Sequence, residues 1–316
     1  MRPFLFITIV AASLLTGCAN GPLPVIISDP PAAVAALPFP AGHVPVALVL
    51  SGGSARAFAH IGVIKVLEEQ GLQPDIIVGT SAGSIVGALY ASGLTATQLE
   101  TALRQMDATV FSDFVMPGFG FLKGEMGFIR GEKLHRFIDA RLKQHHIGNF
   151  PIRFAAITTD LETGKPVAFN AGDAGLAVVA SSAVPGLIRP PEINGKRYGD
   201  GQMTSPLAVN AARSLGAKIV IAVDVVYPPD NSALYSPISV LFQAFTVAVH
   251  QLKENEMLAA DLVIKPDIKK SSDQLNFDDA DWLIASGEKA TREALNKLLP
   301  LFKNAVADTK QRKPQH

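Results

Sequence analysis

Short apolar runs alternate with longer amphipathic runs along most of this chain. The short runs predict buried strands, at Val44–Leu50, Asp75–Val78, Phe154–Thr158, Lys165–Phe169, Lys218–Val225 and Leu262–Lys265. The longer runs predict helices, at Ala57–Gln70, Ser84–Ser92, Ala174–Ser182, Ile238–Leu258 and Asp281–Leu299. Because strands and helices alternate, the sequence predicts one α/β domain with three layers, α/β/α, in which helices cover both faces of a mostly parallel central sheet.

The start of the chain departs from this pattern. An uncharged, largely apolar run from Phe4 to Leu15 follows Arg2; it suits a signal peptide and is too short to span a bilayer. It leads to Leu15-Thr16-Gly17-Cys18, which resembles the lipobox of bacterial lipoproteins, whose cysteine is diacylated and becomes the mature N-terminus. By the same resemblance, Ala19 favours the outer membrane of a Gram-negative cell envelope. The alternative is a short membrane anchor with a buried cysteine.

These observations divide the chain into four segments. Residues 1–17 are predicted to be a lipoprotein signal peptide, and residues 18–45 a lipidated Cys18 followed by a proline-rich, extended tether to the membrane. Residues 46–303 are the predicted domain, and residues 304–316 are expected to be a polar, frayed tail.

Composition and charge narrow the function classes. The chain has 316 residues, of which 48% are hydrophobic and 18% charged, so it is too apolar for a disordered chain and long enough to bury a large core. It carries 28 basic and 28 acidic residues and no basic stripe interleaved with aromatics, which argues against a nucleic-acid partner. A single cysteine excludes a disulfide framework and a cysteine-based zinc site. We see no ligand cluster in the sequence and expect neither a metal nor a cofactor.

A candidate nucleophile lies between the second predicted strand and the helix that follows it. Gly79-Thr80-Ser81-Ala82-Gly83 matches G-x-S-x-G in the strand–turn–helix context that exposes a serine. Gly79 and Gly83 keep bulky side chains out of the turn, and the N-terminal amides of the helix point towards the place where negative charge develops. The alternative is a serine that only caps the helix beside packing glycines.

The loop after the first strand offers candidate hydrogen-bond donors. Gly52-Gly53 leaves backbone N–H groups open to an oxyanion, and the loss of one such donor typically costs about a hundred- to thousand-fold in rate. A phosphate-binding loop is the alternative. The stretch has no lysine before Lys65 and does not satisfy G-x-G-x-x-G, so a nucleotide partner is not expected.

A serine nucleophile needs a base, and the residues offer two kinds of candidate. Of the seven histidines, only His250 and His316 lie late enough for the chain order of an α/β-hydrolase triad, whose base is on a late loop. His250 lies within a predicted helix and His316 is the terminal residue, so neither resembles such a base. Asp200-Gly201 lies in a loop-like run. A dry, apolar site would raise the pKa of its carboxyl from about 3.9 and make it a better base. A turn-forming Asp-Gly pair is the alternative.

Taken together, these segments resemble the patatin-like phospholipase family. The resemblance covers Pro45 to about Val226. It includes, in order, Leu50-Ser51-Gly52-Gly53, Arg56, Ala59–Val63, Gly79–Gly83, Thr159–Gly164, Ala180–Gly186, Tyr198–Gly201 and Ala222–Val225. It implies a patatin-type fold, no cofactor, and a Ser–Asp dyad without histidine, with Ser81 as nucleophile, Asp200 as base and the backbone of Gly52, Gly53 and Ser54 as the oxyanion hole. It also implies hydrolysis of a carboxylic ester in a lipid or phospholipid, as by a phospholipase A or lysophospholipase.

The chain departs from the family's pattern at three positions. The family's glycine loop is usually G-G-G-x-R-G, and here Ser54 replaces the third glycine and Ala57 the last. Gln202 stands where the family's D-G-A or D-G-G motif has a small residue. These changes leave the dyad intact, and they leave open a second hypothesis, a catalytically weak or inactive lipid-binding envelope lipoprotein of the same fold.

Two further features have open roles. Arg56, beside the glycine loop, either holds that loop or meets an anionic head group. A group of large apolar residues lies in one segment that glycines interrupt. It forms the packed core of an insertion, lines an acyl pocket, or inserts into lipid. The group comprises Phe111, Phe114, Met116, Phe119, Phe121, Met126 and Phe128.

Overall fold

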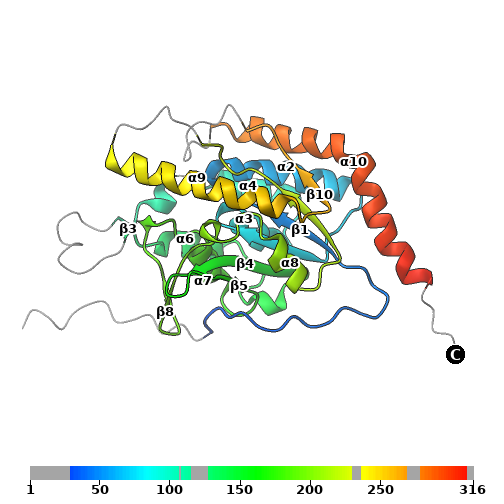
Figure 1. Cartoon of the computed structure of the whole chain (residues 1–316), viewed down its shortest axis with the longest axis horizontal. Coiled ribbons are helices and arrows are strands. Elements are labelled where there is room, and N and C mark those ends of the chain that lie inside the picture. Colours follow the sequence, from blue (N-terminus) through cyan, green and yellow to red (C-terminus); the bar gives the residue numbers. More distant parts are fainter. Residues whose placement is uncertain (1–28, 107, 115–126, 230–235, 269–277, 312–316) are drawn as a thin grey trace, which may run out of the picture.

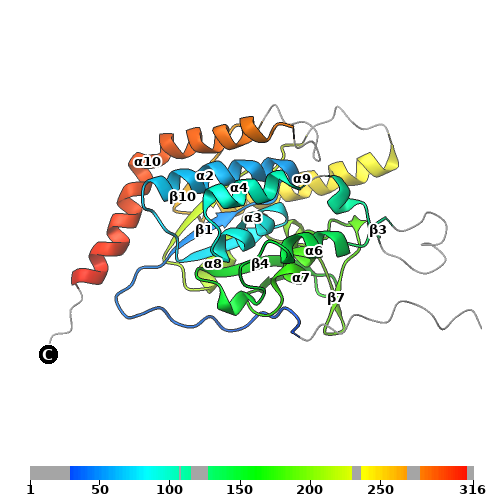
Figure 2. The same cartoon turned by 180° about the vertical axis from the view of Figure 1, so that it is seen from behind.

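A mixed β-sheet forms the centre of the molecule (Figures 1 and 2). The computed structural model describes residues 29–106, 108–114, 127–229, 236–268 and 278–311. In that part of the chain the sheet has eight strands in the order β10-β9-β1-β2-β4-β8-β7, and β5 also pairs with β4. The strands are β1 (Val46–Leu50), β2 (Ile76–Thr80), β4 (Arg153–Asp160), β5 (Pro166–Phe169), β7 (Glu192–Ile193), β8 (Lys196–Asp200), β9 (Ile219–Val223) and β10 (Leu262–Ile264).

The strand directions confirm the predicted, mostly parallel sheet. Strands β10, β9, β1, β2 and β4 pair in parallel. Strands β5 and β8 run antiparallel to β4, and β7 antiparallel to β8. The parallel strands are buried on both faces and therefore have near-continuous apolar sequences, as β1 shows with Val-Ala-Leu-Val-Leu. A separate pair of short parallel strands, β3 (Gly127–Ile129) and β6 (Gly186–Ile188), lies off this sheet.

Helices cover both faces of the sheet, as the alternation of elements predicts. Alternate residues of β1 point to opposite faces, so Leu48 joins the core beneath α2, α3 and α10, whereas Val49 joins the smaller core beneath α8. Complete burial of a leucine such as Leu48 contributes about 2 kcal/mol. The helices are α2 (Phe58–Glu69), α3 (Ala82–Ala91), α4 (Ala96–Arg104), α6 (Glu132–Asp139), α7 (Ala174–Ser181), α8 (Val209–Ser214), α9 (Pro237–Met257) and α10 (Ala280–Gln311).

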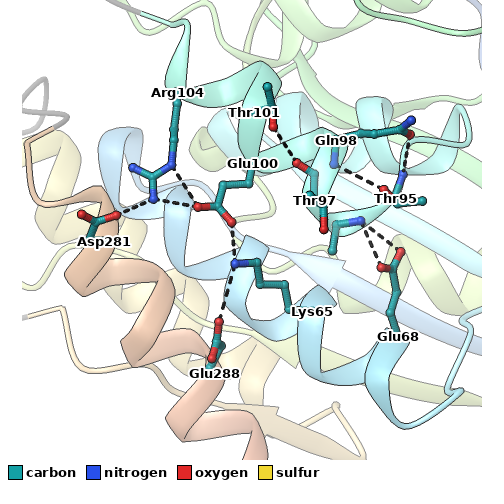
Figure 3. Close-up of polar contacts among 11 residues, drawn as sticks. Lys65, Glu68, Thr95, Thr97, Gln98, Glu100, Thr101, Arg104, Asp281 and Glu288 are labelled. Atoms are coloured by element: carbon teal, nitrogen blue, oxygen red, sulfur yellow. Dashed lines mark hydrogen bonds and ion pairs between the residues drawn. The ribbon is translucent and has the colours of Figure 1, made fainter.

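A network of charged side chains joins the outer helices α2, α4 and α10, which lie side by side in both views (Figures 1 and 2). Figure 3 shows Glu100 of α4 between Lys65 of α2, at 2.5 Å, and Arg104, at 2.7 Å. Arg104 also pairs with Asp281 of α10, and Lys65 lies 3.8 Å from Glu288. Burial acts to raise the pKa of Glu100, but its hydrogen bonds with Lys65 and Arg104 outweigh burial and hold that pKa below its usual value.

The described part of the proline-rich segment, residues 29–45, is extended and lies against the domain. Asn170 exchanges two hydrogen bonds with the backbone of Val34, at 2.8 and 2.9 Å. The Arg153 guanidinium lies 3.5 Å from the centre of the Phe39 ring and donates to the Leu37 carbonyl oxygen. These contacts hold residues 29–45 against the start of β4 and the residue after β5, whereas Cys18 and the rest of the predicted tether lie outside the described residues.

Several elements differ from the sequence-based expectation. Helices α4 and α6 and strands β3, β6, β7 and β8 were not predicted. Helix α10 continues through Pro300 to Gln311, so residues 304–311 of the predicted frayed tail are helical. A proline removes one backbone hydrogen bond and bends a helix, which accounts for the bend of α10 in Figure 1. No helix in the described ranges combines the length and apolar character that crossing a membrane requires.

Candidate active site

Ser81 lies on a sharp turn between β2 and α3. Its φ of 53° and ψ of −128° form a conformation that residues with side chains rarely adopt. A Cβ atom on Gly79 would lie 2.4 Å from the Cα atom of Ser84, and one on Gly83 would lie 2.2 Å from the carbonyl oxygen of Leu50. Only glycine fits at these two positions, so the turn that presents Ser81 depends on both of them.

Asp200 is the last residue of β8 and faces Ser81. The Ser81 hydroxyl donates a hydrogen bond to Asp200 Oδ2 at 2.7 Å, and the backbone N–H of Gln202 donates to Oδ1 at 2.8 Å. A Cβ atom on Gly201 would lie 2.2 Å from the carbonyl oxygen of Ile157 in β4. The chain can therefore turn tightly after the carboxylate only because residue 201 has no side chain.

Burial determines the protonation behaviour of this pair. Asp200 is fully buried, and Ser81 is only 7% exposed. Burial disfavours the carboxylate and raises the pKa of Asp200 to about 7, although the hydrogen bonds from Gln202 and Ser81 act in the opposite direction. At neutral pH the Asp200 carboxyl is therefore partly protonated and partly ionised. A general base works best when its pKa lies near the working pH, as here.

The loop between β1 and α2 presents backbone N–H groups near Ser81. Ser54 and Ala55 line the same cavity as Ser81. Among the described residues, none accepts a hydrogen bond from the backbone N–H of Gly52, Gly53 or Ser54. Ser54 has a φ of 52°, in the left-handed region that glycine adopts most easily. The loop thus keeps the shape of a glycine turn although serine stands at its third position.

Two buried side chains hold this loop from the protein interior. The Arg56 guanidinium lies 3.9 Å from the centre of the Tyr227 ring and donates to the Gly53 carbonyl oxygen at 3.4 Å. The ring of His60 donates from Nε2 to the Ser51 carbonyl oxygen at 2.9 Å. Burial lowers the pKa of His60 to about 4, so its imidazole is neutral at pH 7. These contacts favour the loop-holding role for Arg56 over a direct contact with a head group.

Two serines at the end of α7 reach the same centre. The backbone N–H of Ser81 donates to Ser181 Oγ at 2.9 Å, and the Ser181 hydroxyl donates to the Ile157 carbonyl oxygen at 2.5 Å. Ser182 lines the cavity at Ser81, and its buried Oγ has no hydrogen-bond partner within the described residues. Neither serine was predicted to have a role, although the Ser-Ser pair in the Ala180–Gly186 run was the available signal.

An apolar cavity opens beside Ser81. Apart from Ser54, Ser81 and Ser182, its walls are apolar, and they include Ile85, Met106, Phe111, Ile129 and Leu187. A hydroxyl paired with a buried carboxylate at an apolar cavity, with a loop of free backbone N–H groups beside it, has the parts required for nucleophilic attack on the carbonyl of an apolar acyl group.

Comparison with known proteins identifies the family. Residues 48–213 match the family model described as patatin-like phospholipase. The chain belongs to the patatin-like phospholipase family. This match and the mixed, mostly parallel sheet confirm the predicted patatin-type α/β fold.

Curated relatives of this patatin-like protein are similar over part of their length. An uncharacterized NTE family protein from Mycobacterium bovis is 34% identical over 189 residues, which cover 57% of this chain and 49% of the relative. Lysophospholipase NTE1 from Coccidioides immitis is 35% identical over 193 residues, which cover 59% of this chain and 12% of the relative. The matched part is thus about half of the mycobacterial protein and a small part of the fungal one. Among solved structures, VipD from Legionella pneumophila aligns with a TM-score of 0.47 at 13% identity, over 85% of this chain and 70% of VipD.

The other candidate residues of this patatin-like protein lie elsewhere. His250 is on α9, 3.9 Å from Glu254 one turn later, and does not line the cavity at Ser81. Within the apolar group predicted over residues 111–128, Phe111 lines that cavity, while Phe114 and Phe128 are at least half exposed. Its other four members, together with Cys18 and His316, lie outside the described residues.

The structure also brings together a cluster of one histidine and two aspartates that was not predicted from the sequence. The two ring nitrogens of His135 lie 3.2 Å from Asp173 Oδ1 and 3.5 Å from Asp139 Oδ2. The hydrogen bond to Asp173 is the main cause that raises the pKa of His135. Asp173 Oδ1 also caps α7 by accepting from the Leu176 N–H at 2.7 Å. Ion pairing and helix capping account for this cluster, and we assign it a structural role.

Proposed function

We propose that this chain is a serine acyl hydrolase that cleaves carboxylic esters of lipids through Ser81 and Asp200. The observation that carries the proposal is the 2.7 Å hydrogen bond from the hydroxyl of Ser81, which lines an apolar cavity, to the buried Asp200 carboxylate. The name of the fungal relative, a lysophospholipase, supports a lysophospholipid or phospholipid as the substrate class.

The proposed reaction has two steps in which Asp200 acts first as base and then as acid. Asp200 Oδ2 takes the Ser81 proton while Ser81 Oγ bonds to the acyl carbonyl carbon. The protonated Asp200 then returns the proton to the leaving alcohol or lysolipid as the ester bond breaks. In the second step Asp200 deprotonates water, which attacks the acyl-enzyme, and the proton returns to Ser81 as the fatty acid leaves.

The backbone N–H groups of Gly52, Gly53 and Ser54 are proposed to hold the oxyanion in both steps. Their lack of acceptors among the described residues supports this role, because such donors need no reorganisation when negative charge develops. The apolar cavity walls would hold the acyl chain and exclude water from the reacting atoms.

Anchoring to the cell envelope through a lipidated Cys18 belongs to the same proposal. Metabolic labelling with a palmitate analogue tests it directly: the wild-type chain should become labelled, and Cys18→Ser should not. Two acyl chains on one cysteine would give stable anchoring at about 0.8 kcal/mol per buried methylene.

A fluorophosphonate probe tests the nucleophile and its base. The wild-type chain should be labelled at Ser81, and labelling should be lost in Ser81→Ala and strongly slowed in Asp200→Asn. Ser92→Ala is the matched control, because Ser92 is buried at the opposite end of α3, where its hydroxyl donates to the Leu89 carbonyl oxygen and accepts from the Lys143 N–H. A folded wild-type chain that never labels would favour the inactive lipid-binding alternative, with Ser54 and Gln202 as the first positions to revert.

A further inference from the structure

A second, larger apolar cavity lies at the surface next to the cavity of Ser81. It has a volume of about 530 Å³ and lies between the N-terminal half of α9 and the β3–β6 pair. Two of its side chains are well exposed, Leu241 of α9 at 70% and Phe128 of β3 at 50%. We call this surface the α9–β3 rim; its large apolar members are Phe128, Leu187, Leu241, Phe242 and Phe245.

The rim is continuous with the candidate active site. Val184 and Leu187 line both the surface cavity and the cavity that contains Ser81. An apolar chain that enters at Leu241 would therefore meet apolar walls as far as Ser81. A surface that served only to pack against another protein would not need this connection.

Charges are arranged beside the rim and not within it. The α9 sequence from Ser236 to Val249 contains no charged residue, and Val240 and Val247 on it are 51% and 42% exposed. Arg130 and Arg189 are exposed and follow directly after the paired strands β3 and β6. The backbone N–H of Arg189 bonds to the Ile129 carbonyl oxygen at 2.7 Å, so the two arginines lie side by side next to Phe128.

We propose that the α9–β3 rim docks on an anionic lipid bilayer, with Leu241 and Phe128 in the acyl region and Arg130 and Arg189 at the phosphates. Uncharged apolar side chains bordered by cations fit the acyl–headgroup boundary, since each basic residue near an anionic surface strengthens binding and apolar area adds to it. The idea that the rim delivers a lipid to Ser81 rests on the proposed function, whereas docking itself does not require catalysis.

Quenching of tryptophan fluorescence by brominated lipid tests the docked orientation. The full chain with Ser81→Ala is bound to vesicles of brominated phosphatidylcholine with about a third phosphatidylglycerol. Leu241→Trp should be quenched several-fold more than the parent, in which Trp282 is the single tryptophan. Leu258→Trp is the matched control, since Leu258 directly follows the other end of α9, is 87% exposed, and should gain no such quenching.

Two further variants separate the sources of binding. Arg130→Gln with Arg189→Gln should reduce quenching of Leu241→Trp on vesicles with phosphatidylglycerol and leave it unchanged on pure phosphatidylcholine. Leu241→Asp in the active chain should lower vesicle turnover relative to turnover of a short soluble ester by about ten-fold.

Three outcomes would overturn the proposal. They are equal quenching at positions 241 and 258, no quenching at 241, and a Leu241→Asp variant that changes a dimer to a monomer while vesicle turnover stays constant. Failure of the proposed function is distinguishable, because a chain without esterase activity would still show quenching at position 241.

Discussion

The side chain of Gln202 occupies the space that a side chain on Gly52 would need. A Cβ atom on Gly52 would lie 2.4 Å from Gln202 Cδ and 2.5 Å from its Oε1. Gln202 comes two residues after Asp200, and its backbone N–H bonds to the Asp200 carboxylate. The glutamine that departs from the family's small residue therefore packs the segment carrying Asp200 directly against the glycine loop.

This contact predicts a strong coupling between the two positions. Gly52→Ala should reduce kcat on a soluble ester by at least about ten-fold, because the new methyl group pushes the loop or Gln202 out of place and one oxyanion donor is worth about a hundred- to thousand-fold. Gln202→Ala removes the collision, so Gly52→Ala with Gln202→Ala should recover much of that loss. A double variant no faster than Gly52→Ala alone would show that the contact does not limit the loop.

The buried carboxyl of Asp200 predicts that activity depends on pH near neutrality. Its pKa is raised by burial to about 7, and the base must be deprotonated to accept the Ser81 proton. kcat/KM should therefore rise through about pH 7 and level off above it. Asp200→Asn should lower kcat by about a hundred-fold or more across the whole range. A wild-type profile that is flat from pH 5 to 9 would argue against Asp200 as the base.

The same group predicts a gain of stability on mutation. Because the folded-state pKa of Asp200 lies above the unfolded value of about 3.9, the folded protein holds more protons between those two values, and its stability falls as pH rises through that window. Asp200→Asn cannot ionise. Its single side-chain oxygen can still accept from the Gln202 N–H, and its amide NH2 can donate to Ser81 Oγ. Its melting temperature should exceed that of the wild type at pH 8, and the difference should shrink towards pH 4. An Asp200→Asn variant less stable than wild type at pH 8 would contradict this reading.

The candidate site was predictable where its signals are local. Gly79, Ser81 and Gly83 lie within one turn, and the need for glycine at both flanks follows from steric exclusion alone. The Asp200-Gly201 pair was a local signal as well, although the residues alone left a simple turn open. Contacts across the sheet gave no such signal: the hydrogen bond from Ser81 to Ser181 joins residues a hundred positions apart.

The fold was predictable to a similar extent. Strands such as β1 and β9 are buried on both faces and stand out as continuous apolar runs. Helix α4 was missed although Thr95 and Gln98 form a capping box at its start, because only a few of its residues face the core. The short strand β8 has a polar sequence, Lys-Arg-Tyr-Gly-Asp, and its pairing with β4 and β7 identifies it as a strand.

Ser181 is predicted to position Ser81 without touching the substrate. Ser181→Ala leaves the backbone N–H of Ser81 buried and without an acceptor, which lowers stability by about 1–3 kcal/mol. It also removes a contact that holds Ser81 in its strained conformation. kcat should fall by about ten-fold or more with little change in KM, and the activity midpoint near pH 7 should stay in place because Asp200 keeps its environment. Steady-state kinetics against pH checks both points. An unchanged kcat would show that the turn holds its shape without Ser181.

The buried His60 beneath the glycine loop predicts a loss of stability in mild acid. Its folded-state pKa, about 4, lies below the unfolded value of about 6.5, so the unfolded chain binds more protons between these two values. The free energy of unfolding should therefore fall by roughly 3 kcal/mol from this residue as pH drops from 6.5 to 4. His60→Gln keeps an N–H donor for the Ser51 carbonyl and does not titrate. Urea unfolding at several pH values should show a shallower acid loss in His60→Gln than in wild type; curves of equal steepness would mean that other groups cause the loss.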